Sequence, residues 1–194
     1  MILEDIEIYD GKLLHNRFAY QFHRNSVCST GNIVAFRSPM KVEVEGMIDT
    51  EDILANDFIY SEDAMNFLWE IPGLDPFGAV AFQRLFNTHI SHLIYKRLQC
   101  PIEVDGDDII VHKEHDQGGI VQPKGKCSVS ITYCKNGAAL GHTGINITAG
   151  DKAPAHAFST KIEDANAFMA EVNEAFYGIT RDIFVATTKC YAHD

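Results

Sequence analysis

The sequence predicts an α+β fold in which helices flank a mixed or antiparallel sheet, within a single domain that spans residues 1–194. The length is typical of one domain. Several short apolar segments are joined by turn sequences of the kind found in hairpins. The regular alternation of strands and helices that builds a parallel sheet is missing. These three observations favour hairpins and helices grouped around one sheet.

The N-terminal part of the chain is predicted to contain short strands and one helix. Alternating apolar residues around the turn Asp10-Gly11 favour a hairpin. Residues 32–36 and 42–46 are typical of strands, the first because of its apolar run and the second because of its alternation. A serine followed by two acids favours a helix over residues 61–71, because these residue types stabilise the first turn of a helix.

A long amphipathic helix is predicted from Pro76 to Leu98. Asp75 is a favourable N-cap, and proline is common in the first turn of a helix. Apolar residues recur at helical spacing and are expected to form a buried stripe. The predicted stripe consists of Phe77, Ala81, Leu85, Ile90, Leu93, Ile94 and Leu98.

The second half of the chain is predicted to form further strands and one more helix. The capping box Thr160-x-x-Glu163 indicates a helix that continues to about Tyr177. Residues 113–125 lack periodicity and contain two adjacent glycines, which is typical of a loop. The predicted strands are residues 102–104, 108–112, 127–134, 139–148 and 183–187.

The turn at residues 135–137 decides which side chains of the surrounding hairpin share a face. A two-residue turn would pair Ile131 with His142. A three-residue turn, with its glycine in the left-handed region, pairs Ser130 with His142 instead. We predict the three-residue turn and its register.

In that register one face of the hairpin is polar, because side chains alternate along a strand. Gly141 and Gly144 weaken the second strand, and such glycines often let a ligand approach the backbone. We therefore predict a binding site on this face, and the alternative is a solvated outer face of the sheet. The shared polar face would consist of Lys126, Ser128, Ser130, His142 and Asn146.

Charge and composition exclude several classes of protein. The 27 acidic and 16 basic residues leave a net charge of −11, which argues against an extended grip on duplex DNA. No apolar stretch reaches the roughly 20 residues of a membrane span, and the N-terminus carries acids where a secretory signal carries bases. The five cysteines include no C-x-x-C pair. We therefore expect a cytoplasmic protein with reduced thiols and a small-molecule or nucleotide substrate.

Charged and imidazole side chains indicate the candidate chemistry. A carboxylate can accept two hydrogen bonds from the guanidine edge of a base, although acids also cap helices and turns. Arg37 and Lys126 are candidates for holding a carboxylate or phosphate, with exposed cations as the alternative. His142 is a candidate general base because histidine titrates near neutrality, with a hydrogen-bonded structural histidine as the alternative. The candidate carboxylates are Glu45, Asp49, Glu51, Asp52, Asp107 and Asp108.

Metal and cofactor sites have weaker signals. Two histidines are only half of a zinc site, which needs three or four ligands. The sequence contains no G-x-S-x-G, P-loop or G-x-G-x-x-G, which argues against nucleophile-elbow hydrolases and Rossmann sites, including the common type of methyltransferase. The candidate metal ligands are His112 and His115 with His142 or Cys134, and, on the long helix, His89 and His92.

Residues 10–148 contain the short motifs Phe36-Arg37, Glu45, Met47-x-Asp49-x-Glu51-Asp52, Gln83-Arg84-Leu85, Gly106-Asp107-Asp108-Ile109, Lys126-x-Ser128-x-Ser130-Ile131 and His142-x-Gly144-x-Asn146. In their order and spacing these motifs resemble those of domain-of-unknown-function family 366, which is known from archaea, other microbes and some viruses. The resemblance implies the fold of biotin and lipoate ligases, which is related to the cores of class II aminoacyl-tRNA synthetases. In those ligases a lysine at the start of a strand holds the acyl-adenylate, and Lys126 is similar. The glycine- and arginine-rich ATP loop of biotin ligases has no counterpart in residues 36–39.

The resemblance also implies a link to 7-deazaguanine compounds, the queuosine precursors, including viral pathways that place such bases in DNA. Our first hypothesis is an enzyme that tailors such a base or nucleotide by group transfer, for instance methylation of the 7-aminomethyl amine. The alternatives are decarboxylation of the 7-carboxy compound, an ATP-dependent acyl or cofactor ligase, and a non-catalytic binding module that forms a homodimer through a strand near the C-terminus.

These hypotheses assign roles to particular residues. The sequence does not decide the cofactor: S-adenosylmethionine and zinc are candidates, and ATP is less favoured. The expected catalytic residues are His142, Lys126 and Asp108, and the expected substrate-binding residues are Arg37, Glu45, Gln83, Asp107, Ser128, Ser130 and Asn146.

Overall fold

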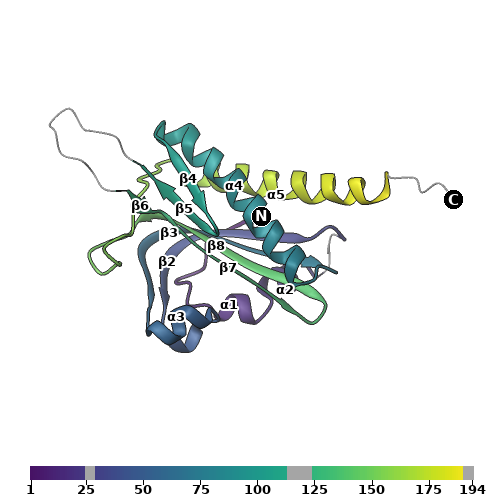
Figure 1. The fold of residues 1–194 in the computed structure, drawn as a ribbon, viewed down its shortest axis with the longest axis horizontal. Helices are drawn as coiled ribbons and strands as arrows, with labels where there is room; N and C mark the ends of the chain where they lie inside the picture. The colour runs from purple at the N-terminus through teal and green to yellow at the C-terminus, as the bar shows by residue number, and fades with distance from the viewer. Residues whose placement is uncertain (25–28, 113–123, 190–194) are drawn as a thin grey trace.

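The computed structural model describes residues 1–24, 29–112 and 124–189. A five-stranded sheet forms its centre, with two long helices on one face and short helices on the other (Figure 1). A separate three-stranded sheet lies toward one end of the molecule. The predicted α+β class with a mixed sheet is confirmed.

The strand order of the large sheet is β1-β2-β3-β8-β7. β1 runs parallel to β2, and the other neighbouring pairs are antiparallel. The small sheet has the order β4-β5-β6 and is antiparallel. The strands are β1 (Ile2–Leu3), β2 (Asn32–Val42), β3 (Ile59–Pro72), β4 (Ile102–Asp105), β5 (Asp108–Val111), β6 (Gly125–Lys126), β7 (Ser128–Lys135) and β8 (Ala138–Thr148).

The central strand β3 occupies the segment in which we predicted a helix, so the prediction for residues 61–71 is wrong. Leu68 belongs to the apolar cluster on one face of the sheet, and Phe67 and Trp69 belong to the cluster on the other. A strand that is buried on both faces is apolar throughout, and periodicity cannot distinguish it from a buried helix. Pairing with β2 on one side and β8 on the other decides the conformation.

The N-terminal hairpin is also a wrong prediction. β1 pairs in parallel with β2, and Gly11 adopts a φ of 88° directly before the first short helix. The predicted strand at residues 42–46 is wrong as well, because β2 ends at Val42 and a 3-10 turn follows, η1 (Val44–Gly46). The short helices are α1 (Lys12–His15), α2 (Phe18–His23) and α3 (Thr50–Ala55).

The long helix α4 (Pro76–Leu98) is confirmed, and its start has the predicted cause. The side chain of Asp75 accepts a hydrogen bond of 2.7 Å from the backbone N–H of Gly78, which satisfies a donor of the first turn. The predicted buried stripe is only partly correct, since Phe77 is 85% exposed and Leu85 is 40% exposed. The buried residues are Ala79, Phe82, Gln83, Phe86, Asn87, Ile90, Ser91 and Ile94.

The last helix, α5 (Ala165–Thr188), has Asp164 as its N-cap. The predicted capping box is therefore wrong, since the hydroxyl of Thr160 donates to the carbonyl of Asn146 and does not cap the helix. Phe168 and Phe176 of α5 are buried. The predicted strand at residues 183–187 is wrong, because this segment continues α5. Figure 1 shows this end of the helix projecting past the sheet. The strand that we expected to join two copies in a non-catalytic homodimer is therefore absent from the structure of residues 124–189.

Two apolar clusters make up the core, one on each face of the large sheet. α4 and α5 cover the larger cluster, in which the ring of Phe82 contacts those of Trp69, Phe86 and Phe176. The smaller cluster includes Tyr9 from the N-terminal segment. None of the helices in the described part of the chain combines the length and apolar character of a membrane span.

Candidate functional site

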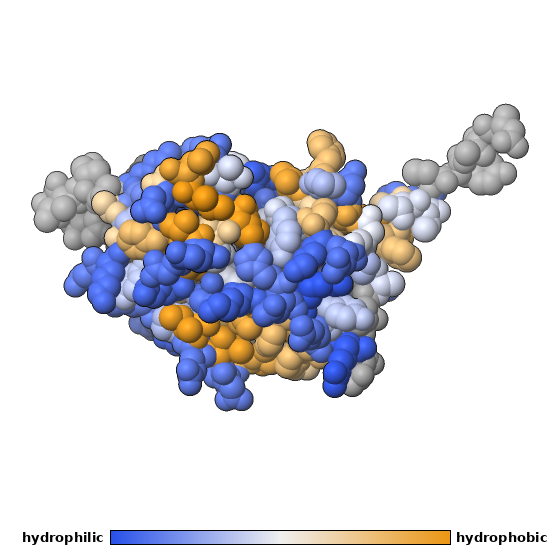
Figure 2. Space-filling view, turned by 90° about the horizontal axis from the view of Figure 1, so that it is seen from below, coloured by the Kyte–Doolittle hydropathy of each residue, from blue (hydrophilic) through white to orange (hydrophobic). Residues whose placement is uncertain are grey.

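A cavity of about 230 Å³ lies on the face of the large sheet that α4 and α5 leave uncovered. Its floor is formed by β7 and β8, and its walls by α1 and by residues 46–52. The turn between β4 and β5 and the short strand β6 complete the rim. Seen from the side of α1 and α3, the molecular surface carries a hydrophilic band between hydrophobic patches (Figure 2). The site is thus built from three separate parts of the chain.

The register of the floor differs from our prediction. The turn has two residues, Asn136 and Gly137, with φ angles of 50° and 76°, and it pairs Ile131 with His142. Two positive φ angles are typical of a type I′ turn, whose twist matches that of the flanking strands. The predicted three-residue turn is therefore wrong, and every side chain of β7 lies on the face opposite to the one expected.

Ser128 and Ser130 consequently direct their hydroxyl groups toward the other face of the sheet, Ser130 to α4 and Ser128 to β5. The Oγ of Ser130 accepts a hydrogen bond of 3.0 Å from Nε2 of Gln83, on α4. The Oγ of Ser128 accepts one of 2.7 Å from the backbone N–H of Ile109. Gln83, Ser128 and Ser130 are all buried, and their polar groups are used within the fold. Ser130 borders this cavity and Ser128 borders a smaller one beside it, but both hydroxyl groups are bonded within the fold, so their role in substrate binding stays a prediction.

Lys126 nevertheless lines the same cavity as His142, because it belongs to β6 of the small sheet and not to β7. Its backbone N–H donates to the carbonyl of His156 at 2.8 Å, and its carbonyl accepts from the N–H of Phe158 at 2.8 Å. Gly125 permits this approach, since a Cβ there would lie 2.8 Å from the Cβ of Phe158. The change of sheet between β6 and β7 therefore places the lysine in the cavity.

Acidic residues dominate the charge of this cavity. The ammonium group of Lys126 lies 2.6 Å from Oδ1 of Asp108, and both side chains are 32% exposed. Asp107 lies beside this pair, and its Oδ1 is 3.3 Å from Nη1 of Arg84. Among the described residues of the lining, Lys126 is the single lysine or arginine. The lining carboxylates are Asp49, Glu51, Asp52, Asp107 and Asp108.

Asp52 has an unusual electrostatic environment. Burial raises the pKa of its carboxyl group, and the nearby carboxylates of Asp49 and Asp57 raise this pKa further. Asp49 caps α3, because its Oδ1 accepts a hydrogen bond of 2.8 Å from the N–H of Glu51. The capping alternative therefore holds for Asp49, while Asp52 is the carboxyl group of this cluster that takes up a proton more readily than usual.

His142 is a buried, neutral imidazole. Burial lowers its pKa to about 3, so the near-neutral titration on which our general-base prediction depended is not found. The Nε2–H group donates to Oδ1 of Asn66 at 3.0 Å, and the ring stacks on Tyr9 with a centroid distance of 3.9 Å. His142 thus contributes an aromatic surface and a fixed tautomer to the floor of the cavity.

The wall formed by α1 depends on two glycines that the sequence analysis did not connect. A Cβ on Gly46 would lie 2.8 Å from the carbonyl oxygen of Asp10, and one on Gly11 would lie 2.8 Å from that of Gly46. His15 also reaches this segment, with Nε2 3.2 Å from the Gly46 oxygen. The Asp10-Gly11 sequence was visible as a turn, but only the fold reveals that it closes a cavity.

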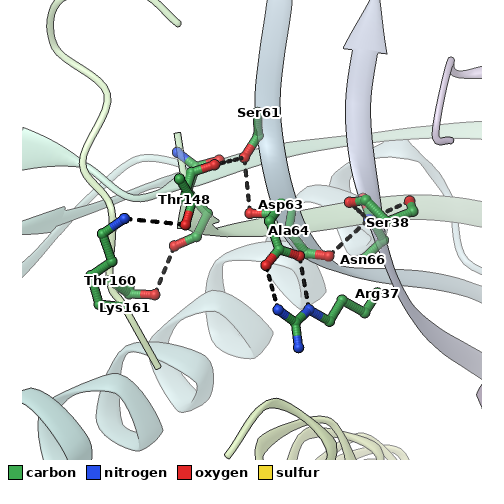
Figure 3. A network of polar contacts seen from close by, with 10 residues as sticks. Arg37, Ser38, Ser61, Asp63, Ala64, Asn66, Thr148, Thr160 and Lys161 are labelled. Atoms are coloured by element: carbon green, nitrogen blue, oxygen red, sulfur yellow. Dashed lines mark hydrogen bonds and ion pairs between the residues drawn. The ribbon is translucent and has the colours of Figure 1, made fainter. Parts of the chain in front are cut away.

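Two other predicted ligand-binding residues lie outside the lining. Arg37 is exposed and forms a fork with Asp63, with Nε–Oδ1 and Nη2–Oδ2 distances of 2.8 and 2.5 Å (Figure 3). This ion pair raises the pKa of the Arg37 guanidinium further. Glu45 is exposed on η1 and is not part of the lining. Neither residue is positioned to hold a ligand in the cavity.

The predicted reason for Gly141 and Gly144 is also corrected. A Cβ at Gly141 would lie 2.1 Å from ring atoms of Trp69, and one at Gly144 would lie 2.5 Å from the sulfur of Met40. The glycines therefore make room for large core side chains and not for a ligand.

A metal centre is not supported by the described residues. No group of three histidine, cysteine or acidic side chains among residues 1–24, 29–112 and 124–189 is arranged to hold a metal ion. Nε2 of His112 lies 2.7 Å from Oε2 of Glu103, and His115 falls outside the described residues. His89 and His92 are exposed on α4.

The fold is similar to that of several solved proteins. A protein of unknown function from Pyrococcus horikoshi aligns with a TM-score of 0.80 and 24% identity, over 100% of this chain and 99% of that chain. Biotin protein ligase from Aquifex aeolicus, in complex with biotin and ATP, aligns with a TM-score of 0.55 and 10% identity, over 93% of this chain and 70% of that chain.

A bi-partite lipoate protein ligase from Thermoplasma acidophilum aligns with a TM-score of 0.52 and 10% identity, over 93% of this chain and 83% of that chain. These similarities confirm the predicted biotin/lipoate-ligase-like fold. No curated protein sequence matches the chain. The family model described as Domain of unknown function (DUF366) matches residues 1–191, and the chain therefore belongs to this family, as its short motifs predicted.

Proposed function

We propose that this protein is an enzyme that removes the carboxyl group from a small, nitrogen-rich heteroaromatic acid of the 7-carboxy-7-deazaguanine type. The observation that carries the proposal is the Lys126–Asp108 ion pair in a nucleobase-sized cavity that is otherwise lined by carboxylates. The 7-deazaguanine class itself comes from the family resemblance, and the chemistry of the lining is consistent with it.

The carboxylates of the cavity suit a base that presents several N–H donors. A guanine-like edge carries an amino group and a ring N–H side by side, and one carboxylate can accept a hydrogen bond from each. Asp107, between β4 and β5, and Glu51, on α3, both line the cavity. Either carboxylate would serve as the acceptor for the guanine-like edge. Bound phosphates, in contrast, would face five carboxylates and one lysine.

Decarboxylation needs a proton donor and an environment that disfavours the substrate carboxylate. In the proposed reaction the Lys126 ammonium attracts this carboxylate and transfers a proton to the ring carbon that bears it. The bond from that carbon to the carboxyl group then breaks, its electron pair restores the aromatic ring, and carbon dioxide leaves. Solvent returns a proton to Lys126. The reaction consumes one proton and requires no oxidant, reductant or co-substrate.

The neighbouring acids would favour this step. The carboxylates of Asp108 and Asp52 repel the negative charge of the bound substrate, and this repulsion disappears as neutral carbon dioxide forms. Asp108 also holds the lysine in place.

Methyl transfer, our first hypothesis from the sequence, fits the site less well. The cavity of about 230 Å³ is smaller than the roughly 300–1,000 Å³ of sites for drug-sized ligands, so it suits one small bicyclic molecule but not a base together with S-adenosylmethionine. The amine would also need a base, and His142, whose pKa is lowered to about 3, is a weak one.

Release of carbon dioxide from 7-carboxy-7-deazaguanine tests the proposal. We expect Lys126→Met to reduce kcat by roughly 100-fold or more, the usual contribution of an acid catalyst. Lys124→Met is a matched control, because Lys124 forms an ion pair of the same 2.6 Å length with Glu103 but does not line the cavity. The proposal is wrong if the wild-type protein binds the acid and releases no carbon dioxide, or if the two variants are equally impaired.

A second candidate is an ATP-dependent ligase for an acyl group or cofactor. It is favoured by the fold, which is similar to biotin and lipoate ligases, and by Lys126 at the edge of the sheet. The acidic lining argues against a ligase, because the lining carboxylates would repel the phosphate of an acyl-adenylate. Pyrophosphate release from ATP in the presence of lipoate or biotin would favour the ligase and contradict the decarboxylase.

A further inference from the structure

A second cavity of about 80 Å³ adjoins the first. The two share Asp52, Ile59, Lys126 and Val129, so one ligand can extend from one cavity to the other past the lysine. The second cavity also borders Asn146 of β8, on the same face of the sheet as His142, because side chains alternate along the strand.

The side chain of Asn146 is buried, and its amide oxygen has no hydrogen-bond partner among the described residues. The residue is 3% exposed, and within the described residues its Oδ1 accepts no hydrogen bond. Its backbone groups, in contrast, are bonded within the described chain. The N–H donates to the carbonyl oxygen of Cys127 at 2.9 Å, and the carbonyl oxygen accepts from the hydroxyl of Thr160 at 2.7 Å. A buried polar group without a partner destabilises a fold, so each one that a protein keeps needs an explanation. A ligand in the second cavity would supply the missing donor.

We infer that the second cavity binds the sugar of a nucleoside, with a sugar hydroxyl donating to Oδ1 of Asn146, so that the substrate is a nucleoside and not the free base. This inference rests on the proposed function, which puts the heterocycle in the larger cavity. The second cavity has room for roughly two or three waters, at about 30 Å³ each, and so for one sugar hydroxyl and the ring carbons beside it. A hydroxyl can donate to the amide oxygen and also accept from the amide nitrogen.

The charges around the second cavity argue for an unphosphorylated sugar. Asp52 and Asp57 line it, and the ammonium of Lys126 is already paired with Asp108 at 2.6 Å. A 5′-phosphate would lie close to both acids and lacks a lysine or arginine of its own among the described lining residues. The nucleoside is therefore expected to bind better than its monophosphate.

Calorimetric titration with three probes tests this inference: 7-carboxy-7-deazaguanine, its 2′-deoxyribonucleoside and the corresponding 5′-monophosphate. In the wild type we expect the nucleoside to bind roughly three- to tenfold more tightly than the base, the value of one hydrogen bond. Asn146→Leu should abolish this difference without weakening the binding of the free base. Asn173→Leu is the control, because Asn173 on α5 is the other asparagine whose buried Oδ1 lacks a partner in the described chain, and it lines neither cavity.

The outcomes separate the two proposals. Equal affinity for base and nucleoside, or equal weakening of both by Asn146→Leu, would overturn the sugar site alone. A preference for the nucleoside that depends on Asn146, without release of carbon dioxide, would overturn the decarboxylase alone. If none of the three probes binds, both are wrong. Unfolding midpoints add an independent check: Asn146→Leu should be at least as stable as the wild type, and a marked loss of stability would show that the amide serves the fold.

Discussion

The two faces of the β7–β8 hairpin differ in how fully their polar side chains are hydrogen-bonded. On the helix face, Oγ of Ser130 contacts Oγ1 of Thr143 at 3.0 Å, and Thr143 donates to Oδ1 of Asn87 at 3.1 Å. On the cavity face, Oδ1 of Asn146 has no partner in the described chain, and Asp52 lies among other acids. The satisfied groups, including the His142–Asn66 pair on the cavity face, belong to the fold, and Oδ1 of Asn146 is available to a ligand.

The satisfied network also supports the cavity. Nδ2 of Asn87 donates to the backbone carbonyl of Asp107 at 2.8 Å. The helix α4 therefore holds the turn between β4 and β5, which carries two of the cavity carboxylates. The hydrogen-bonded network on the helix face therefore holds the rim of the cavity in place. Variants on the two faces should differ in their effect on the free energy of unfolding.

The largest expected effect is overpacking of the helix face. Gly141→Ala would place a Cβ 2.1 Å from the rigid indole of Trp69, and we expect a loss of about 3 kcal/mol in the free energy of unfolding. Gly144→Ala, on the cavity face, meets the flexible Met40 and should cost less. Urea denaturation of both variants measures the difference. Equal losses would show that the two faces are packed alike.

A smaller effect is expected from acid. The folded pKa of His142 is lowered to about 3, below its unfolded value, so the folded state resists its protonation. The stabilisation is complete above about pH 6.5 and is lost as the pH falls toward 3, by up to about 1.4 kcal/mol per pH unit. His142→Gln should flatten this dependence between pH 6.5 and 5, as measured by urea midpoints at each pH. An unchanged slope would contradict the buried, neutral imidazole.

The network on the helix face should contribute about 1 kcal/mol per hydrogen bond. Thr143→Val keeps the shape of the side chain but leaves Asn87 and Ser130 without one partner each. We expect the free energy of unfolding to fall by about 1 kcal/mol. Asn146→Leu removes an Oδ1 that accepts no hydrogen bond from the described residues, so it should not lower the free energy of unfolding. Thermal unfolding of the pair compares the faces directly, and a loss in both variants would remove the distinction.

The smallest effect is expected at Asp52. Its pKa is raised in the folded state by burial and then by Asp49 and Asp57, so its charge opposes folding once the pH exceeds the unfolded pKa. Asp52→Asn should therefore stabilise the protein at pH 7 by less than about 1 kcal/mol, since the group is partly exposed and screened by solvent. The gain should vanish near pH 3. Denaturation at the two pH values tests this, and destabilisation at pH 7 would contradict the electrostatic account.

Prediction from sequence succeeded where a local signal was sufficient. Asp75 and Pro76 predicted the start of α4, and the strands predicted at residues 102–104 and 108–112 form the β4–β5 hairpin. It failed for β3, because a strand with two buried faces has no alternation. It also failed at the end of α5, where Ile183, Phe184 and Val185 favour a strand but continue a helix that is already formed.

The site residues were predicted with mixed success for a physical reason. Lys126, Asp108 and His142 line one cavity as expected, but the predicted three-residue turn was not the cause. A shift of one residue moves every side chain of a strand to the opposite face, and this shift places Ser128 and Ser130 on the face that α4 and α5 cover. The catalytic and substrate-binding roles of all these residues remain predictions.

The sequence by itself determined the family, the fold class, the long helix and the residue types that could carry chemistry. Only the tertiary structure decided which of them meet. Lys126 reaches the cavity because the chain changes sheets at Cys127, and the wall closes because the segments around Gly11 and Gly46 approach backbone to backbone. Such contacts join parts of the chain that are distant in sequence, and local propensity and periodicity contain no information about them.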